Sequence, residues 1–210
     1  MVRAGLPDKM AQTQQACPLA VSNLRYPQPQ ALVMKEWGDA FKVTLGNNQI
    51  MTVQRRGVFG FSDLGKQVKE LYMGNTKLLT ITHDRVWFGR PTISINRVTG
   101  RQGEDGTPVM KTKPGRAVWL GRRKMTANLM PPGSEPVKVT LKTKTFNSAK
   151  GSIVNAASKQ TLATIERKRF SAREMLAGQQ SYTVTVQPNV DMAVVSAMMV
   201  CFDEFFYEGK

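Results

Sequence analysis

The fold of this chain is decided near its end, by Met192-Ala193-Val194-Val195-Ser196-Ala197-Met198-Met199-Val200-Cys201-Phe202, a helix-length segment that is apolar on every side. A helix that is apolar all round must be enclosed by protein or by lipid. As a helix this segment would rise about 16 Å, roughly half of the ~30 Å hydrocarbon core of a bilayer. We therefore expect it inside a protein core.

Short segments with alternating apolar residues precede this helix. Residues 41–45 and 50–55 flank Gly46-Asn47-Asn48, and residues 68–73 and 77–82 flank Gly74-Asn75-Thr76, so two hairpins are predicted. Further strands are predicted at 85–88, 92–97, 117–122, 137–143, 152–155, 162–168 and 181–186. The pattern favours a mainly β protein, closed around the central helix.

Other segments punctuate this pattern. Residues 99–108 and 130–136 are rich in glycine and proline and are expected to be exposed loops. The spacing of Ser171 and Glu174 is typical of a capping box and predicts a short helix that ends at Gly178. For the terminal helix we expect Asn189 to cap the first turn and Asp191 to complement the helix dipole.

The organisation expected is one domain with an N-terminal arm. Residues 1–30 contain four prolines and no periodic pattern, which indicates a flexible arm, and residues 31–210 form the single domain. The two cysteines, Cys17 and Cys201, lie in the arm and in the apolar helix, so no disulfide is expected. With no apolar signal segment, we expect an intracellular, cytoplasmic monomer, peripheral at a membrane if it binds lipid, with the nucleus as the alternative location.

Positive charge is concentrated in one third of the chain. The formal net charge is +15, and between Lys111 and Arg173 fifteen lysines and arginines face two acids, Glu135 and Glu166. Such an excess attracts polyanions, which include anionic membrane surfaces and nucleic acid. A solvated basic surface that serves solubility is the alternative interpretation.

Reactive chemistry has few candidates in this sequence. His83 is the only histidine, and because neighbouring strand residues point to opposite faces, Asp84 is badly placed to orient it. One histidine and two distant cysteines do not supply a zinc site, and no glycine-rich segment opens a helix after a strand. A barrel filled by a helix also leaves little room for a small-molecule substrate, so we expect no enzyme activity, metal or cofactor.

Three segments carry a resemblance to a known family. The passage 181–193 with Pro188-Asn189-Val190-Asp191, the segment Val58-Phe59-Gly60, and His83-Asp84-Arg85 followed by Trp87 resemble the plant LURP-one-related proteins over roughly residues 30–207. Here Val86 is inserted before the tryptophan. The resemblance implies the closed antiparallel barrel of about twelve strands around a buried C-terminal helix that tubby C-terminal domains and phospholipid scramblases share. It also implies a role in plant defence, with no biochemical activity established.

The candidate binding residues follow from the basic clusters. Tubby domains bind phosphoinositide head groups through a Lys-x-Arg pair, but no position here aligns with that pair. The expected ligand is an anionic phospholipid surface or an acidic protein partner, and the alternative is nucleic acid bound by the same surface. A lipid-moving activity like that of the scramblases is a third class. The candidate residues are Arg122, Arg123, Lys124, Lys142, Lys144, Arg167, Lys168 and Arg169.

Overall fold

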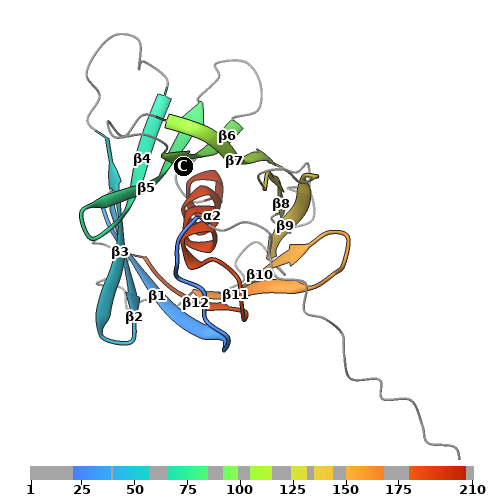
Figure 1. The fold of residues 1–210 in the computed structure, drawn as a ribbon, viewed down its shortest axis with the longest axis horizontal. Helices are drawn as coiled ribbons and strands as arrows, with labels where there is room; N and C mark the ends of the chain where they lie inside the picture. Colours follow the sequence, from blue (N-terminus) through green and yellow to red (C-terminus); the bar gives the residue numbers. More distant parts are fainter. Residues whose placement is uncertain are drawn as a thin grey trace, which may run out of the picture.

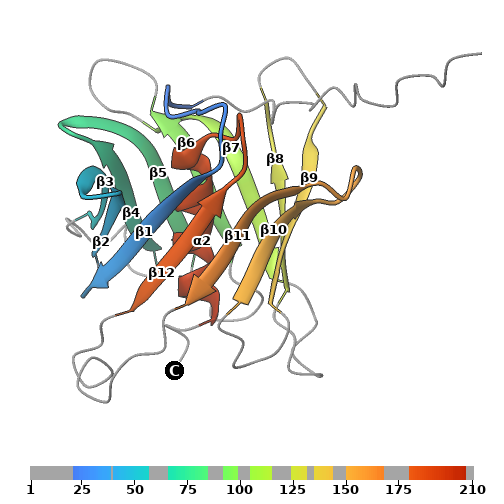
Figure 2. The ribbon, with the colours of Figure 1, turned by 90° about the horizontal axis from the view of Figure 1, so that it is seen from below.

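The computed structural model describes residues 21–38, 40–56, 66–84, 92–98, 105–114, 124–131, 135–143, 150–167 and 180–206. Twelve strands in this part of the chain form one closed antiparallel barrel, and a single helix runs through its centre (Figure 1, Figure 2). Around the barrel the strands follow the order β1-β12-β11-β10-β9-β8-β7-β6-β5-β4-β3-β2. The predicted fold class, a mainly β closed barrel around a C-terminal helix, is confirmed.

The strands are short and alternate buried with exposed side chains. Their bounds are β1 Gln30–Trp37, β2 Ala40–Leu45, β3 Asn48–Arg55, β4 Lys66–Met73, β5 Thr76–Asp84, β6 Thr92–Val98, β7 Asp105–Pro114, β8 Lys124–Leu129, β9 Val137–Thr143, β10 Lys150–Asn155, β11 Thr161–Arg167 and β12 Ser181–Val186. The inner set of alternate residues builds the barrel wall of the core.

The helix, α2 Met192–Phe206, fills the barrel. Met198 is 1% exposed and Phe202 is 2% exposed, and Cys201 lies buried between them. Burial raises the pKa of the Cys201 thiol well above its ordinary value, and the nearby Glu204 carboxylate raises it further. No helix in the described ranges is both long enough and apolar enough to cross a membrane.

Both hairpins predicted from the sequence are present. Gly46 (φ 59°) and Gly74 (φ 57°) open the turns of β2–β3 and β4–β5 with a left-handed backbone that a glycine adopts without steric cost. Where β2 pairs with β3 and where β4 pairs with β5 the register shifts once, and such bulges bend a strand toward closure of a barrel.

Three strands depart from the predictions. β1 begins at Gln30, inside the expected arm, and β7 begins at Asp105, inside the expected loop 99–108. Irregular register where β6 pairs with the start of β7 accommodates Gly106 and Pro108 in a strand. β8 covers Lys124–Leu129, which no strand was predicted to cover. The predicted strands 85–88 and 117–122 and the predicted helix 171–178 lie outside the described residues.

Asp191 caps α2 and ties the chain before β1 to it. Its carboxylate accepts hydrogen bonds from the Ala193 and Val194 amides of the helix and from the Val21 and Ser22 amides. The prediction that Asn189 caps the helix is therefore wrong, because the helix begins at Met192 and Asp191 directly precedes it. Asn189 instead adopts φ 60° and donates its amide to the Tyr26 carbonyl.

Candidate anion-binding end of the barrel

Because successive strands run in opposite directions, the barrel has two ends with different residues. At one end the odd-numbered strands finish and the even-numbered strands begin, as the pairs Trp37–Ala40, Lys66–Asp84 and Lys124–Lys142 show. In Figure 2 the arrowheads of β1 and β11 lie at this end and β12 runs the opposite way. We call it the basic end, for the reason that follows.

The basic end carries most of the cations of the barrel. At this end, the last or first three residues of each of the twelve strands together include nine lysines and arginines and three acids. At the other end, the corresponding residues include three lysines and arginines and one acid. The acids at the basic end are Glu36, Asp84 and Glu166. The cations are Lys35, Lys42, Arg55, Lys66, Lys113, Lys124, Lys142, Lys150 and Arg167. Five of these nine cations come from residues 111–173, and the other four come from β1–β4.

The connecting segments add to the same asymmetry. Residues 38–39, 56–65, 85–91, 115–123, 144–149 and 168–180 join strands at the basic end, and in sequence they hold ten lysines and arginines against three acids. The connections at the opposite end hold two lysines and arginines against three acids. These connections are residues 46–47, 74–75, 99–104, 130–136, 156–160 and 187–191. Most of these residues lie outside the described ranges, so this is a fact of sequence and connectivity.

The eight predicted site residues fall into three groups. Lys124 and Lys142 are exposed and lie directly opposite each other on β8 and β9. Arg167 ends β11 on the register of the buried Ala163 and Ile165, so it is half-buried and lies on the inner side, unlike the two lysines. The other five lie outside the described residues, in segments that join strands at the basic end. These five are Arg122, Arg123, Lys144, Lys168 and Arg169.

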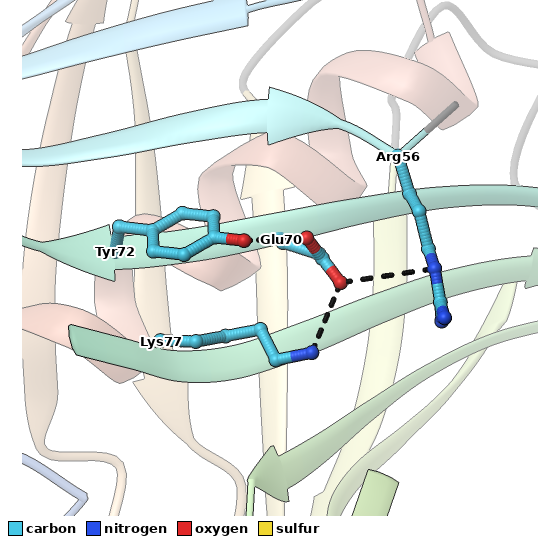
Figure 3. A network of polar contacts seen from close by, with 4 residues as sticks. All are labelled: Arg56, Glu70, Tyr72 and Lys77. Carbon is cyan, nitrogen blue, oxygen red and sulfur yellow. Dashed lines mark hydrogen bonds and ion pairs between the residues drawn. The ribbon is translucent and has the colours of Figure 1, made fainter. Parts of the chain in front are cut away.

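On the side wall of the barrel, at β3–β5, two cations are paired with the carboxylate of Glu70. Glu70 accepts hydrogen bonds from the Tyr72 hydroxyl at 2.6 Å and from Lys77 Nζ at 3.0 Å, and Arg56 Nε lies 4.0 Å from the same carboxylate (Figure 3). Although burial alone would raise it, these partners hold the pKa of Glu70 below its ordinary value. Cations of this cluster are compensated locally, unlike Lys124 and Lys142, whose facing strands β8 and β9 contain no acid.

The hydroxyl of Tyr72 should titrate unusually late. Its hydrogen bond to Glu70 and its partial burial raise its pKa from 10.0 to about 12, so the protonated form is favoured in the folded protein until that pH. We expect Glu70→Gln to return the pKa toward 10.0, because the acceptor loses its charge. The difference in tyrosinate absorbance between wild type and Tyr72→Phe measures this, with Lys138→Gln as control. Ordinary titration of Tyr72 in wild type would contradict the network.

A charged cluster inside the barrel joins the last turn of α2 to the wall, and the sequence analysis did not find it. Lys69 Nζ lies 3.2 Å from Glu204 Oε1, and His83 Nδ1 lies 3.8 Å from Glu204 Oε2. The Lys69 ammonium also lies 5.4 Å from the ring centroid of Phe41. The available signal was the position of Lys69 two residues before the buried Leu71, on the inward face of β4.

This interior cluster links the enclosed helix to the barrel wall. The side chains of Lys69 and Glu204 are 2% and 1% exposed, so a substrate cannot reach the pair without opening the barrel. The Tyr182 hydroxyl, which bonds the Asp203 carboxylate, adds a second link between helix and wall. In the described ranges no group of three or more histidine, cysteine, aspartate or glutamate side chains is placed to hold a metal ion.

Comparison with known proteins agrees with the architecture. A family model described as LURP-one-related matches residues 31–203. The matched range runs from the second residue of β1 to Asp203 in α2, so it covers the barrel and most of the enclosed helix. A search of curated proteins and a search of solved structures each find no match.

Proposed function

The chain belongs to the LURP-one-related family, and from this premise we propose that it is a non-enzymatic docking protein whose basic end binds anionic phospholipid head groups. The observation that carries the proposal is the gathering of nine strand-terminal cations at one end of the barrel, against three at the other. In this proposal the protein acts as a monomer at a cytoplasmic membrane surface. Docking there serves the defence role that the family resemblance implies.

Electrostatics favours a surface as the ligand. Each lysine or arginine near an anionic leaflet contributes about 1 kcal/mol, and the contribution fades within a Debye length of about 8 Å at physiological salt. Cations at strand ends occur on strands all round the barrel, so an anionic surface that meets this end can contact several of them together. Lys35, Lys42, Lys124 and Lys142 are all exposed and come from both sides of the barrel.

An acidic protein partner and nucleic acid are the competing ligands. The same cations would attract a phosphate backbone, with an affinity that falls steeply as salt rises. Proteins that bind single strands usually add several aromatic side chains on which bases stack. Among the described residues only Tyr26 and Trp37 are exposed large hydrophobic side chains, and Tyr26 contacts the opposite end through Asn189. The connecting segments of the basic end also contain aromatic residues in sequence, so aromatic content does not separate the two ligands and the binding experiment below does; these residues are Phe59, Phe61, Trp87, Phe88, Trp119, Phe146 and Phe170.

Sedimentation with vesicles tests the proposal. Wild-type protein is expected to bind phosphatidylcholine vesicles that contain phosphatidylserine or phosphoinositide, and to leave pure phosphatidylcholine vesicles unbound. Since two lysines together contribute about 2 kcal/mol, Lys124→Gln with Lys142→Gln should weaken binding about tenfold or more at low salt. Both lysines are exposed on β8 and β9, so the barrel should remain folded.

The matched control carries the same change in net charge. Lys138→Gln with Lys159→Gln removes two exposed lysines from the opposite end, and we expect less than about a twofold change. Equal losses in both variants would show that net charge, and not the basic end, governs binding. Negligible binding of wild type to every vesicle, together with tight salt-sensitive binding to oligonucleotides, would favour the nucleic-acid alternative.

A further inference from the structure

An exposed tryptophan stands at the basic end. Trp37 is the last residue of β1 and is 70% exposed, the largest exposure of any large hydrophobic residue in the described ranges. Single exposed apolar residues are common and carry no message by themselves. The charged residues near Trp37 are what indicate a ligand.

Two lysines flank Trp37 on the same outer face of the barrel. Lys35 precedes it by two residues and is exposed, and Lys42 on β2 lies directly opposite Lys35. The residue opposite Trp37 is the small Ala40, and Gly38, at φ 59°, follows Trp37 with no side chain, so neither of these two neighbours covers the indole. An amphipathic ring thus projects beside two ammonium groups.

Trp37 lies across the barrel from Lys124 and Lys142 but at the same end. β1 is separated from β8 by β12, β11, β10 and β9 on one side and by six strands on the other, so a side-on contact cannot include both Trp37 and Lys124. An end-on contact includes both, because Trp37 and Lys124 terminate their strands at the basic end. The tryptophan therefore favours one orientation, with the barrel end toward the ligand.

We infer that Trp37 enters the head-group region of an anionic phospholipid bilayer when the basic end docks, with Lys35 and Lys42 contacting lipid phosphates beside it. The inference rests on the proposed function and deepens it by naming the bilayer interface as the ligand and the end-on orientation as the mode. Tryptophan is enriched at membrane interfaces because its ring is apolar and its N–H remains hydrogen-bonded, and lysines complement anionic head groups. A soluble polyanion offers the lysines the same phosphates but gives the indole no apolar layer.

Vesicle binding and fluorescence quenching test this inference together. Binding of wild type, Trp37→Ala and Tyr26→Ala is measured on phosphatidylserine-containing vesicles and on heparin. Burial of the indole predicts that Trp37→Ala weakens vesicle binding about tenfold and leaves heparin binding unchanged. Tyr26→Ala, which removes an exposed ring from the opposite end, should change neither. The exposed position of Trp37 makes an unchanged unfolding midpoint the folding control.

Brominated phosphatidylcholine in the vesicles supplies the direct readout. Bromine quenches an indole within the bilayer interface, so bound wild type should lose a part of its fluorescence that bound Trp37→Ala does not lose. Suppose that wild type binds the vesicles, and that Trp37→Ala binds them as tightly and loses as much fluorescence to the brominated lipid. Trp37 is then not an anchor, and the inference is overturned while the proposed function stands. If wild type does not bind these vesicles at all, both fail.

Discussion

Replacing Lys69 with methionine is expected to lower the free energy of unfolding by about 3–5 kcal/mol, because it leaves a buried carboxylate without its cation. The Lys69 ammonium lies 3.2 Å from Glu204, and both side chains are almost completely removed from solvent. Methionine has a similar volume, so the loss would come from charge and not from a cavity. Urea unfolding measures it, with an unchanged slope as the sign that the native barrel is retained.

A double variant tests whether the unpaired charge of Glu204 causes the loss of stability. Lys69→Met with Glu204→Gln removes both charges, and we expect it to recover a substantial part of the loss, since two neutral groups are cheaper to bury than one unpaired charge. Lys150→Met is the control for an exposed pair. Its partner Glu166 is closer, at 2.8 Å, but the side chains are 68% and 58% exposed, so no measurable change is expected. A Lys69→Met variant as stable as Lys150→Met would contradict the assigned role of the buried pair.

The elements that the sequence predicted well are those with an unambiguous period. β2, β3, β9 and β12 alternate, and α2 is apolar on all sides, so their positions follow from local pattern, whereas β4 and β5 are located by the turn residues Gly74 and Asn75 between them. The position of β7 does not follow from local pattern, because Gly106 and Pro108 are tolerated there only by irregular pairing with β6, which is a tertiary effect. In β8, Met125 and Leu129 alternate with polar residues around the small Ala127, a weak signal in six residues.

The candidate site was harder to predict than the fold. Lys124 and Lys142 lie eighteen positions apart in sequence and become neighbours only through the β8–β9 register. That both lie at the same end depends on whether each strand is odd- or even-numbered in chain order. This numbering requires every strand to be known, and β1, β7 and β8 were not predicted as strands. One signal was present in the chain: connecting segments 85–91, 115–123 and 144–149 are basic, while 99–104 and 130–136 between them are not.

Arg167 and Lys69 illustrate the same dependence on register. Both are cations in strands, and a sequence excess of charge assigns such residues to the surface by default. Two-residue periodicity places Lys69 with Leu71 and Arg167 with Ile165 on the inner side, where a cation is stable only with a partner. The partner of Lys69 comes from α2, and the pairing of strand with enclosed helix has no local sequence pattern.

Asp191→Asn should destabilise the protein by about 2–3 kcal/mol, since it removes the charge from a buried acceptor of several hydrogen bonds. Oδ2 accepts the Val21 and Ser22 amides, both at 2.7 Å, and Oδ1 accepts the Ser22 hydroxyl at 2.9 Å and the Ala193 amide at 2.8 Å. An asparagine can keep the oxygen that caps the helix, but its amide nitrogen cannot accept the two backbone donors that precede β1.

The loss in Asp191→Asn should therefore be divided unequally between the helix and the segment before β1. Hydrogen exchange of the Val21 and Ser22 amides should become faster by a larger factor than exchange of the Ala193 amide, which retains an acceptor. Ser22→Ala removes the hydroxyl that donates to Asp191 and accepts the Leu24 amide; it leaves the carboxylate in place, so it is the graded control and should cost about 1 kcal/mol. If Asp191→Asn unfolds at the wild-type urea concentration, or if Val21 and Ser22 stay as protected as before, then this carboxylate does not hold the chain before β1 against the helix.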